Sequence, residues 1–298
     1  MNTPHPGPEA RPSAALCGRR VAGDRGLIMA IVNRTPDSFF DKGATFDDAP
    51  AMERVRTAVA DGADIIDIGG VKAGPGDDVD AAEEIRRVVP FIEAVHGEFP
   101  DVLLSVDTWR SEVAAPAVAA GASIINDTWA GYDSTLVHTA AETGAGFVCS
   151  HTGSATPRTR PYRVGYEDIV GSVRDELAGA AHAAADAGVA RDAIIVDPTH
   201  DFGKNTHHGL ALLRNLGPLV ELGYPLLMAL SNKDFIGETL DLGVDERGEG
   251  TLAASAVALW QGARILRCHD VRGTRRVAEM VASIEGTRPP ARVTRGLI

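Results

Sequence analysis

Four short apolar segments, far apart in the chain, each end in a polar side chain that can hydrogen-bond a flat heterocycle. The polar residues are Asp107 in SVDT, Asn126 in IIND, Asp197 in IIVDP and Lys233 in ALSNK. Each apolar run has the character of a buried parallel strand, and in an α/β barrel the carboxyl ends of such strands carry the chemistry. Two carboxylates, a carboxamide and an ammonium can together satisfy many N–H and C=O groups. The sequence therefore predicts a site for a polar ring such as a pterin.

A second set of polar residues ends the first and the last apolar runs. Asn33 closes LIMAIVN, and Arg267 and His269 are two residues apart in ARILRCHD, which places them on the same strand face. The first and eighth strands of a closed barrel are neighbours, so these three side chains should face one pocket. An arginine can hold a phosphate with a fork of donors, and an asparagine amide oxygen can bind a metal ion. The three residues therefore predict a phosphate site, at which the Asn33 amide oxygen could bind a metal ion.

The elements that must position these residues are eight apolar runs separated by Ala-rich amphipathic stretches. The runs lie near residues 27–33, 64–70, 102–108, 123–128, 146–151, 193–198, 225–231 and 263–270. Strands without apolar–polar alternation are buried on both faces, as in a parallel sheet. Eight of them alternating with helices favour an α/β fold, the (β/α)8 TIM barrel, which typically needs about 250 residues. No GxGxxG follows the first run, which weakens the doubly wound alternative.

Composition excludes several classes of protein. The net charge of −12 argues against nucleic acid and against an anionic membrane surface as partners. Three widely spaced cysteines indicate neither a disulfide framework nor a CxxC metal site, and a cytoplasmic location fits best. We expect one barrel domain over residues 23–287. Residues 1–22, rich in Pro, Gly and Arg, are expected to form a flexible tail, and residues 288–298 an irregular one.

Seven ordered motifs make the chain resemble dihydropteroate synthase. They are MAIVNRTPDSFFD, DIIDIGG, SVDT, IIND, DPxxxFGK, SxKxFIG and RxHDV, and they span about residues 26–285. The resemblance implies a TIM barrel, usually a homodimer, and a transferase of folate biosynthesis. That enzyme joins a hydroxymethyl-dihydropterin diphosphate to p-aminobenzoate, and the pyrophosphate leaves bound to Mg2+.

The resemblance also implies roles for the residues at matching positions. Those implied for the pterin are Asp107, Asn126, Asp197 and Lys233, and those implied for the diphosphate and its Mg2+ are Asn33, Arg267 and His269. Asp37, on the loop after the first strand, would lie near the reacting methylene and favour the positive charge that develops there. With Lys233 and Asp107 it forms the implied catalytic set.

Several positions on the side of the second substrate depart from the family pattern. The second loop reads GGVKAGPG where the family has GGESTRPG, so that Ala73 and Gly74 replace a threonine and an arginine. The seventh motif reads SNKDFIG where the family has SRKSFIG, which introduces Asn232 and Asp234. In the family that serine opens a helix that receives the carboxylate of p-aminobenzoate. We expect Asp234 to cap the helix itself and to repel a second anion.

The sixth motif also departs from the family pattern, because DPTHDFGK adds His200 and Asp201 near the same wall. These changes favour a homologue that keeps the pterin site, has an altered acceptor site and resembles the divergent, inactive paralogue of the family. Two alternatives stay open. One is an active enzyme that uses a neutral or cationic acceptor. The other is an ordinary dihydropteroate synthase in which Lys72, Arg34 or Arg158 restores the positive charge. The pterin-binding module of a corrinoid-dependent methyltransferase ranks last, because it has no reason to keep RxHD and FIG together.

Overall fold

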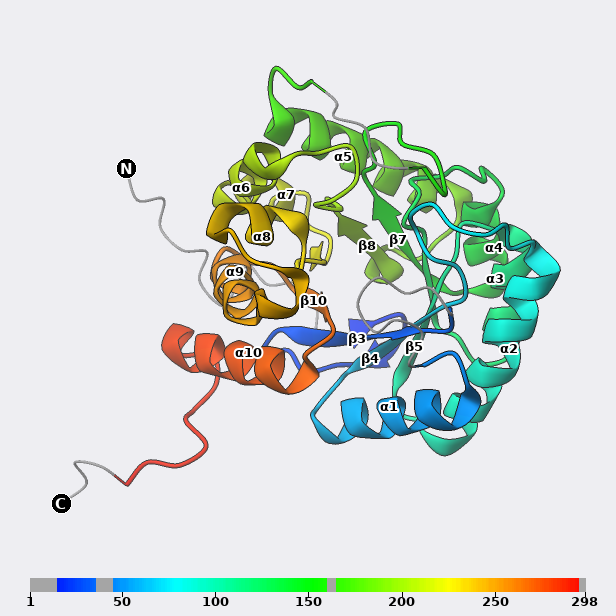
Figure 1. The fold of residues 1–298 in the computed structure, drawn as a ribbon, viewed down its shortest axis with the longest axis horizontal. Helices are drawn as coiled ribbons and strands as arrows, with labels where there is room; N and C mark the ends of the chain where they lie inside the picture. Colours follow the sequence, from blue (N-terminus) through cyan, green and yellow to red (C-terminus); the bar gives the residue numbers. More distant parts are fainter. Residues whose placement is uncertain (1–14, 36–44, 160–164, 295–298) are drawn as a thin grey trace.

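The computed structural model describes residues 15–35, 45–159 and 165–294, and these form a barrel of eight parallel strands (Figure 1). The strands are β3 (Leu27–Asn33), β4 (Ile65–Gly69), β5 (Leu103–Asp107), β6 (Ile124–Asn126), β7 (Gly146–Ser150), β8 (Ile194–Asp197), β9 (Leu227–Met228) and β10 (Ile265–Cys268). They pair in the order β8-β7-β6-β5-β4-β3-β10-β9, and a parallel bridge from Val196 to Leu226 joins the two ends. The predicted TIM barrel is confirmed.

Helices surround the barrel and bury their apolar sides against it (Figure 1). They are α1 (Asp48–Ala60), α2 (Ala81–Glu98), α3 (Ser111–Ala119), α4 (Leu136–Thr143), α5 (Ile169–Ala187), α6 (Thr206–Arg214), α7 (Gly217–Val220), α8 (Asp234–Leu240), α9 (Gly248–Trp260) and α10 (Val271–Glu285), with short 3-10 turns at Arg191–Ala193 and Val244–Glu246. Gly62 and Gly262 follow α1 and α9 at φ of 96° and 105°. Only glycine adopts such angles without strain, which explains why the chain leaves these helices there.

Strand periodicity sorts the barrel interior into an apolar bottom and a polar top. In β3, Leu27 and Met29 belong to the lower core cluster, whereas Ile31 and Asn33, on the same face, line a cavity above it. In β10, Ile265 belongs to the bottom and Arg267 lies above it. Along one face of these strands, the lower residues therefore pack in the apolar core and the residues above them line the cavity.

The bottom of the barrel is closed by a hairpin of β1 (Ala15–Leu16) and β2 (Arg19–Arg20). Leu16 is buried among Leu27, Met29, Ile65 and other residues of the lower cluster. The expectation of a flexible tail through residue 22 is therefore wrong for residues 15–22, because a leucine within that segment finds an apolar surface to cover. At the other end, residues 288–294 contain no helix or strand. No helix among the described residues is long and apolar enough to span a membrane.

Candidate functional site

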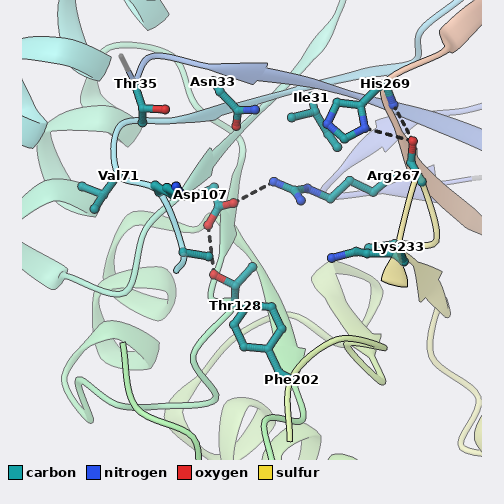
Figure 2. Close-up of a pocket in the computed structure, with 14 residues that line it drawn as sticks. Ile31, Asn33, Thr35, Val71, Asp107, Thr128, Phe202, Lys233, Arg267 and His269 are labelled. Carbon is teal, nitrogen blue, oxygen red and sulfur yellow. Dashed lines mark hydrogen bonds and ion pairs between the residues drawn. The ribbon is translucent and has the colours of Figure 1, made fainter. Parts of the chain in front are cut away.

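Arg267 lies at the centre of the upper barrel and bridges two carboxylates. Its Nε donates to Oδ2 of Asp67 at 2.6 Å, and its Nη2 donates to Oδ2 of Asp107 at 2.7 Å. Figure 2 shows the arginine extended across the mouth of the barrel toward Asp107, which also accepts a hydrogen bond from the Thr128 hydroxyl at 3.0 Å. Charge-assisted bonds of this kind are stronger than bonds between neutral groups. The guanidinium is therefore held rigidly between β4 and β5.

Asp67 is a site residue that the sequence analysis missed. It is fully buried, and it also accepts from the Ser105 hydroxyl at 2.6 Å and from Nδ2 of Asn126 at 3.2 Å. A signal was present in IIDIGG, because a carboxylate in the middle of a buried strand needs a cationic partner. The partner, Arg267, is 200 positions further along the chain.

The carboxyl groups implied for the heterocycle lie in an environment that favours their protonated form. Burial raises the pKa of Asp107 to about 7 although Arg267 opposes the shift, and burial raises the pKa of Asp197 to about 6. Asp197 accepts one bond from the backbone N–H of Thr199 at 2.8 Å. Oδ1 of Asn126 is buried and has no hydrogen-bond partner within the described residues. Such groups can pair with the donors and acceptors of a flat ring.

The upper cavity, of about 110 Å³, brings together the residues predicted for the diphosphate. Asn33, Arg267 and His269 all line it, as do Asp107 and Lys233 (Figure 2). His269 is oriented by a hydrogen bond between its Nδ1 and the Ser231 hydroxyl at 2.9 Å. The predicted convergence of β3 and β10 on one pocket is present. Asp37 lies outside the described residues.

Lys233 lines both this cavity and a second one, and its ammonium is paired with Asp201. The Nζ to Oδ2 distance is 2.8 Å. Asp201 comes from the DPTHDFGK loop, one of the departures from the family pattern. The lysine implied for the pterin therefore forms an ion pair with a carboxylate from the loop expected beside the acceptor site.

The second cavity, of about 470 Å³, adjoins the first and contains the four positions predicted as the altered acceptor site. It is lined by Lys72, Ala73, Gly74, Trp129, Thr159, His200, Asp201, Phe202, Lys204, Asn205, Thr206, Asn232, Lys233, Asp234, Phe235 and Glu238. The structure thus gathers Ala73, Gly74, Asn232 and Asp234 on one cavity although they come from two distant loops.

Asp234 does not cap α8, contrary to expectation. It is the first helical residue, with Lys233 at the N-cap position, and its Oδ1 accepts from Nη1 of Arg247 at 2.8 Å. The side chain turns to Arg247 because the guanidinium is an available cation beside it. Asn232 has φ of 56°, a conformation that asparagine tolerates, and its backbone N–H donates to the hydroxyl of Thr251 at 3.1 Å.

Two of the three cations proposed to restore the acceptor site are engaged elsewhere. Arg34 is buried, stacks on Phe91 with its guanidinium carbon 4.5 Å from the ring centroid, and pairs with Asp48. The expectation that Arg34 supplies a charge in the pocket is wrong, because its side chain points into the α1–α2 packing.

Arg158 connects two loops of the rim. Its Nη1 donates to the Lys72 carbonyl at 2.7 Å, and its Nη2 donates to the carbonyl of Asp77. It therefore fastens the loop after β7 to the loop after β4. Of the three cations, only Lys72 lines the two cavities.

Comparison with known proteins agrees with this geometry. The family described as pterin binding enzyme matches residues 29–269, and the chain belongs to that family. It is a dihydropteroate synthase homologue: it is 37% identical to the dihydropteroate synthase of Streptococcus pyogenes over 271 residues, which cover 90% of this chain and 98% of that one. It is 62% identical over 286 residues, 95% of this chain and 90% of the other, to a Mycobacterium tuberculosis protein named inactive dihydropteroate synthase 2.

Solved structures show the same fold. A Yersinia pestis dihydropteroate synthase with a sulfonamide drug complex superposes with a TM-score of 0.86 at 32% identity, covering 92% of this chain and 99% of that one. A Mycobacterium tuberculosis structure that is 51% identical superposes with a TM-score of 0.74 and covers 93% of this chain and 100% of the other.

Proposed function

We propose that this protein binds a reduced pterin in the upper barrel and has little or no dihydropteroate synthase activity. The observation that carries the proposal is the pair of carboxylates, Asp201 and Asp234, on the wall of the cavity beside Lys233. The 62% identical relative named inactive supports it as well. Asp107, Asn126, Asp197 and Lys233 would pair with the ring.

The electrostatics of the second cavity disfavour an anionic acceptor. Two unit charges about 4 Å apart interact by about 1 kcal/mol in water and by about 4 kcal/mol near a protein surface. Asp234 is largely exposed, so its repulsion lies near the lower value, whereas Asp201 is less exposed. A carboxylate of p-aminobenzoate would also find Lys233 and Arg247 already neutralised.

The site should still bind the diphosphate group of the substrate, but with lower affinity than in the family. Asn33, Arg267 and His269 would contact the diphosphate, but Ala73 and Gly74 supply no side-chain donors. Each lost hydrogen bond to a charged group is worth about 1.5–3 kcal/mol, so binding at least tenfold weaker is expected. Mg2+ prefers oxygen ligands and is usually bound by one or two carboxylates together with substrate phosphates and water, and the Asn33 amide oxygen would take one such position. When bound it would neutralise the departing pyrophosphate. Asp37 would favour the positive charge left on the methylene.

The test is to titrate a hydroxymethyl-dihydropterin and p-aminobenzoate separately into the purified chain by calorimetry, with a dihydropteroate formation assay beside them. We expect heat of binding for the pterin, none for p-aminobenzoate up to millimolar concentration, and no product above background. The Streptococcus pyogenes enzyme serves as the positive control. Ordinary turnover with micromolar p-aminobenzoate would refute the loss of activity, and absence of pterin binding would refute the retained site.

We further propose a homodimer formed through α9 and α10, which pack against each other (Figure 1). Val257, Met280 and Ile284 on these helices are 46%, 61% and 59% exposed, an unusual concentration of apolar side chains on adjacent elements. Replacing both Met280 and Ile284 by Glu is expected to convert a dimer into a monomer in sedimentation velocity, because buried charges at an interface are costly. Tyr132→Glu, at another exposed apolar side chain, should leave the dimer intact. A monomeric parent, or a dimeric double variant, would contradict the proposal.

We propose a cytoplasmic location as well. Cys17, Cys149 and Cys268 are all free thiols, and burial raises the pKa of Cys17 and of Cys149 to about 12. Free thiols without disulfides are usual in a reducing compartment.

A further inference from the structure

His200 is a buried histidine on the wall of the second cavity, and neither ring nitrogen has a partner with hydrogen-bond geometry among the described residues. Its side chain is 3% exposed, and neither ring nitrogen makes a hydrogen bond, although the Gly209 backbone lies nearby. The ring packs against Phe235, with 5.5 Å between the centroids. A buried polar group without a partner is costly, and native structures rarely keep one without a reason.

Burial lowers the pKa of His200 to about 3, and the positive charges of Lys204 and Lys233 act in the same direction. The imidazole is therefore neutral at physiological pH. A neutral imidazole offers one N–H donor and one acceptor nitrogen. It suits a ligand group that carries both a donor and an acceptor, such as an amide or a hydroxyl.

Ion pairs or backbone contacts engage three of the charged side chains in this cavity: Asp201, Asp234 and Lys204. The cavity is also lined by Lys72 and by Glu238, whose carboxylate accepts a hydrogen bond from the Thr206 hydroxyl. Asp201 is paired with Lys233 at 2.8 Å, and Asp234 with Arg247 at 2.8 Å. Lys204 donates to the carbonyls of three residues, at 2.9 to 3.1 Å. A ligand carboxylate would have to displace Asp201 to reach Lys233, and a ligand cation would share the cavity with Lys72, Lys204 and Lys233.

Aromatic side chains form part of the cavity wall. Trp129, Phe202 and Phe235 line it, and the rings of Trp129 and Phe202 meet edge to face with centroids 4.6 Å apart. Such surfaces contact a flat aromatic ligand well.

We propose that the second cavity binds an uncharged aromatic ligand whose polar group hydrogen-bonds His200. Because this cavity adjoins the upper one, the inference rests on the proposed function: the ligand occupies the place that p-aminobenzoate takes in an active dihydropteroate synthase. Asp201 and Asp234 exclude the anion, and His200 selects the neutral group.

Three ligands that differ only in the group para to the amine test this directly. p-Aminobenzoate, p-aminobenzamide and p-aminobenzamidine share the ring and the amine but carry a negative, a neutral and a positive group. Titrated by calorimetry into the full chain, with and without a bound hydroxymethylpterin, the amide is expected to bind at least about tenfold more tightly than either charged analogue. Tightest binding by the benzoate, which would point to Lys72 as its partner, overturns the proposal. Tightest binding by the amidine, or no binding by the amide, does so too.

The His200→Phe variant separates recognition from packing. It should lose the advantage of the amide over the charged analogues to within about twofold, while its melting temperature stays equal to or above that of the parent, because an unsatisfied polar group has been removed. His200→Gln, which keeps a donor and an acceptor, should retain part of the advantage. An undiminished preference in His200→Phe overturns the role of His200.

Pterin titrations on the same samples distinguish this inference from the proposed function. Amide preference without pterin binding would refute the proposed function and leave the second cavity as described. Pterin binding without amide preference would refute only the inference.

Discussion

Replacing Arg267 by Met is expected to reduce the free energy of unfolding by about 3–5 kcal/mol at pH 8, the range typical of removing one partner from a buried ion pair. The substitution leaves the carboxyls of Asp67 and Asp107 facing each other in the barrel without the cation that now joins them at 2.6 and 2.7 Å. Of the substitutions considered, this one is expected to destabilise the fold most. It should also abolish pterin binding, since Asp107 would no longer be held in place.

The pH dependence of the Arg267→Met effect identifies its cause. In the folded protein Asp107 has its pKa raised to about 7, whereas in the unfolded chain it lies near 3.9. The folded state therefore binds the proton of the Asp107 carboxyl more tightly than the unfolded state does. The contribution of Asp107 to the free energy of unfolding then falls as pH rises from about 4 to about 7. Without Arg267 the pKa of Asp107 in the folded protein rises further. The substitution should therefore reduce the free energy of unfolding less at pH 5, where Asp107 is protonated in parent and variant alike, than at pH 8.

The measurement is urea unfolding of parent and variant at both pH values. Arg267→Lys keeps the charge but not the two-pronged geometry, and it should lose about half as much stability. An Arg267→Met protein whose loss is the same at pH 5 and pH 8 would show that packing, rather than the two carboxylates, dominates.

Removing Asp201 and Asp234 together, as Asp201→Gly and Asp234→Ser, is expected to raise the affinity for p-aminobenzoate about 10- to 100-fold, or about 1.4–2.8 kcal/mol. Each substitution deletes a negative charge from the cavity wall and also releases a cation, Lys233 or Arg247, from its ion pair. The exposed position of Asp234 makes its share the smaller one.

Calorimetry with p-aminobenzoate in the presence of a bound pterin checks this. Asp101→Gly with Asp186→Ser removes the same number of charges from exposed positions outside both cavities, and it should change the affinity less than twofold. Unchanged affinity in the cavity variant would mean that the acceptor side is altered in some other way.

Ala73→Thr, Gly74→Arg and Asn232→Arg, added to the cavity variant, then test whether turnover returns. Arg at the positive φ of residue 232 costs about 1–2 kcal/mol of stability.

Much of this protein can be read from local patterns. Strand runs, helix ends at Gly62 and Gly262, and the polar residues that close each strand depend on a few neighbouring residues. The period of two along β10 is enough to place Arg267 and His269 on one face. For the same reason the chemistry-bearing positions Asn33, Asp107 and Lys233 and the barrel itself could be predicted, and all three side chains do line the upper cavity.

The pairings between those residues could not be predicted. The Arg267–Asp67 contact joins residues 200 positions apart, and Arg158 reaches the Lys72 carbonyl across 86 positions. Arg34 likewise stacks on Phe91, a residue that no short window of sequence around Arg34 contains. The order of residues determines which groups arrive at the rim, because strand geometry repeats every two residues. Closure of the barrel decides which of these groups meet, because it brings charges that are distant in sequence within a few ångströms. In the buried interior each of these charges needs a partner.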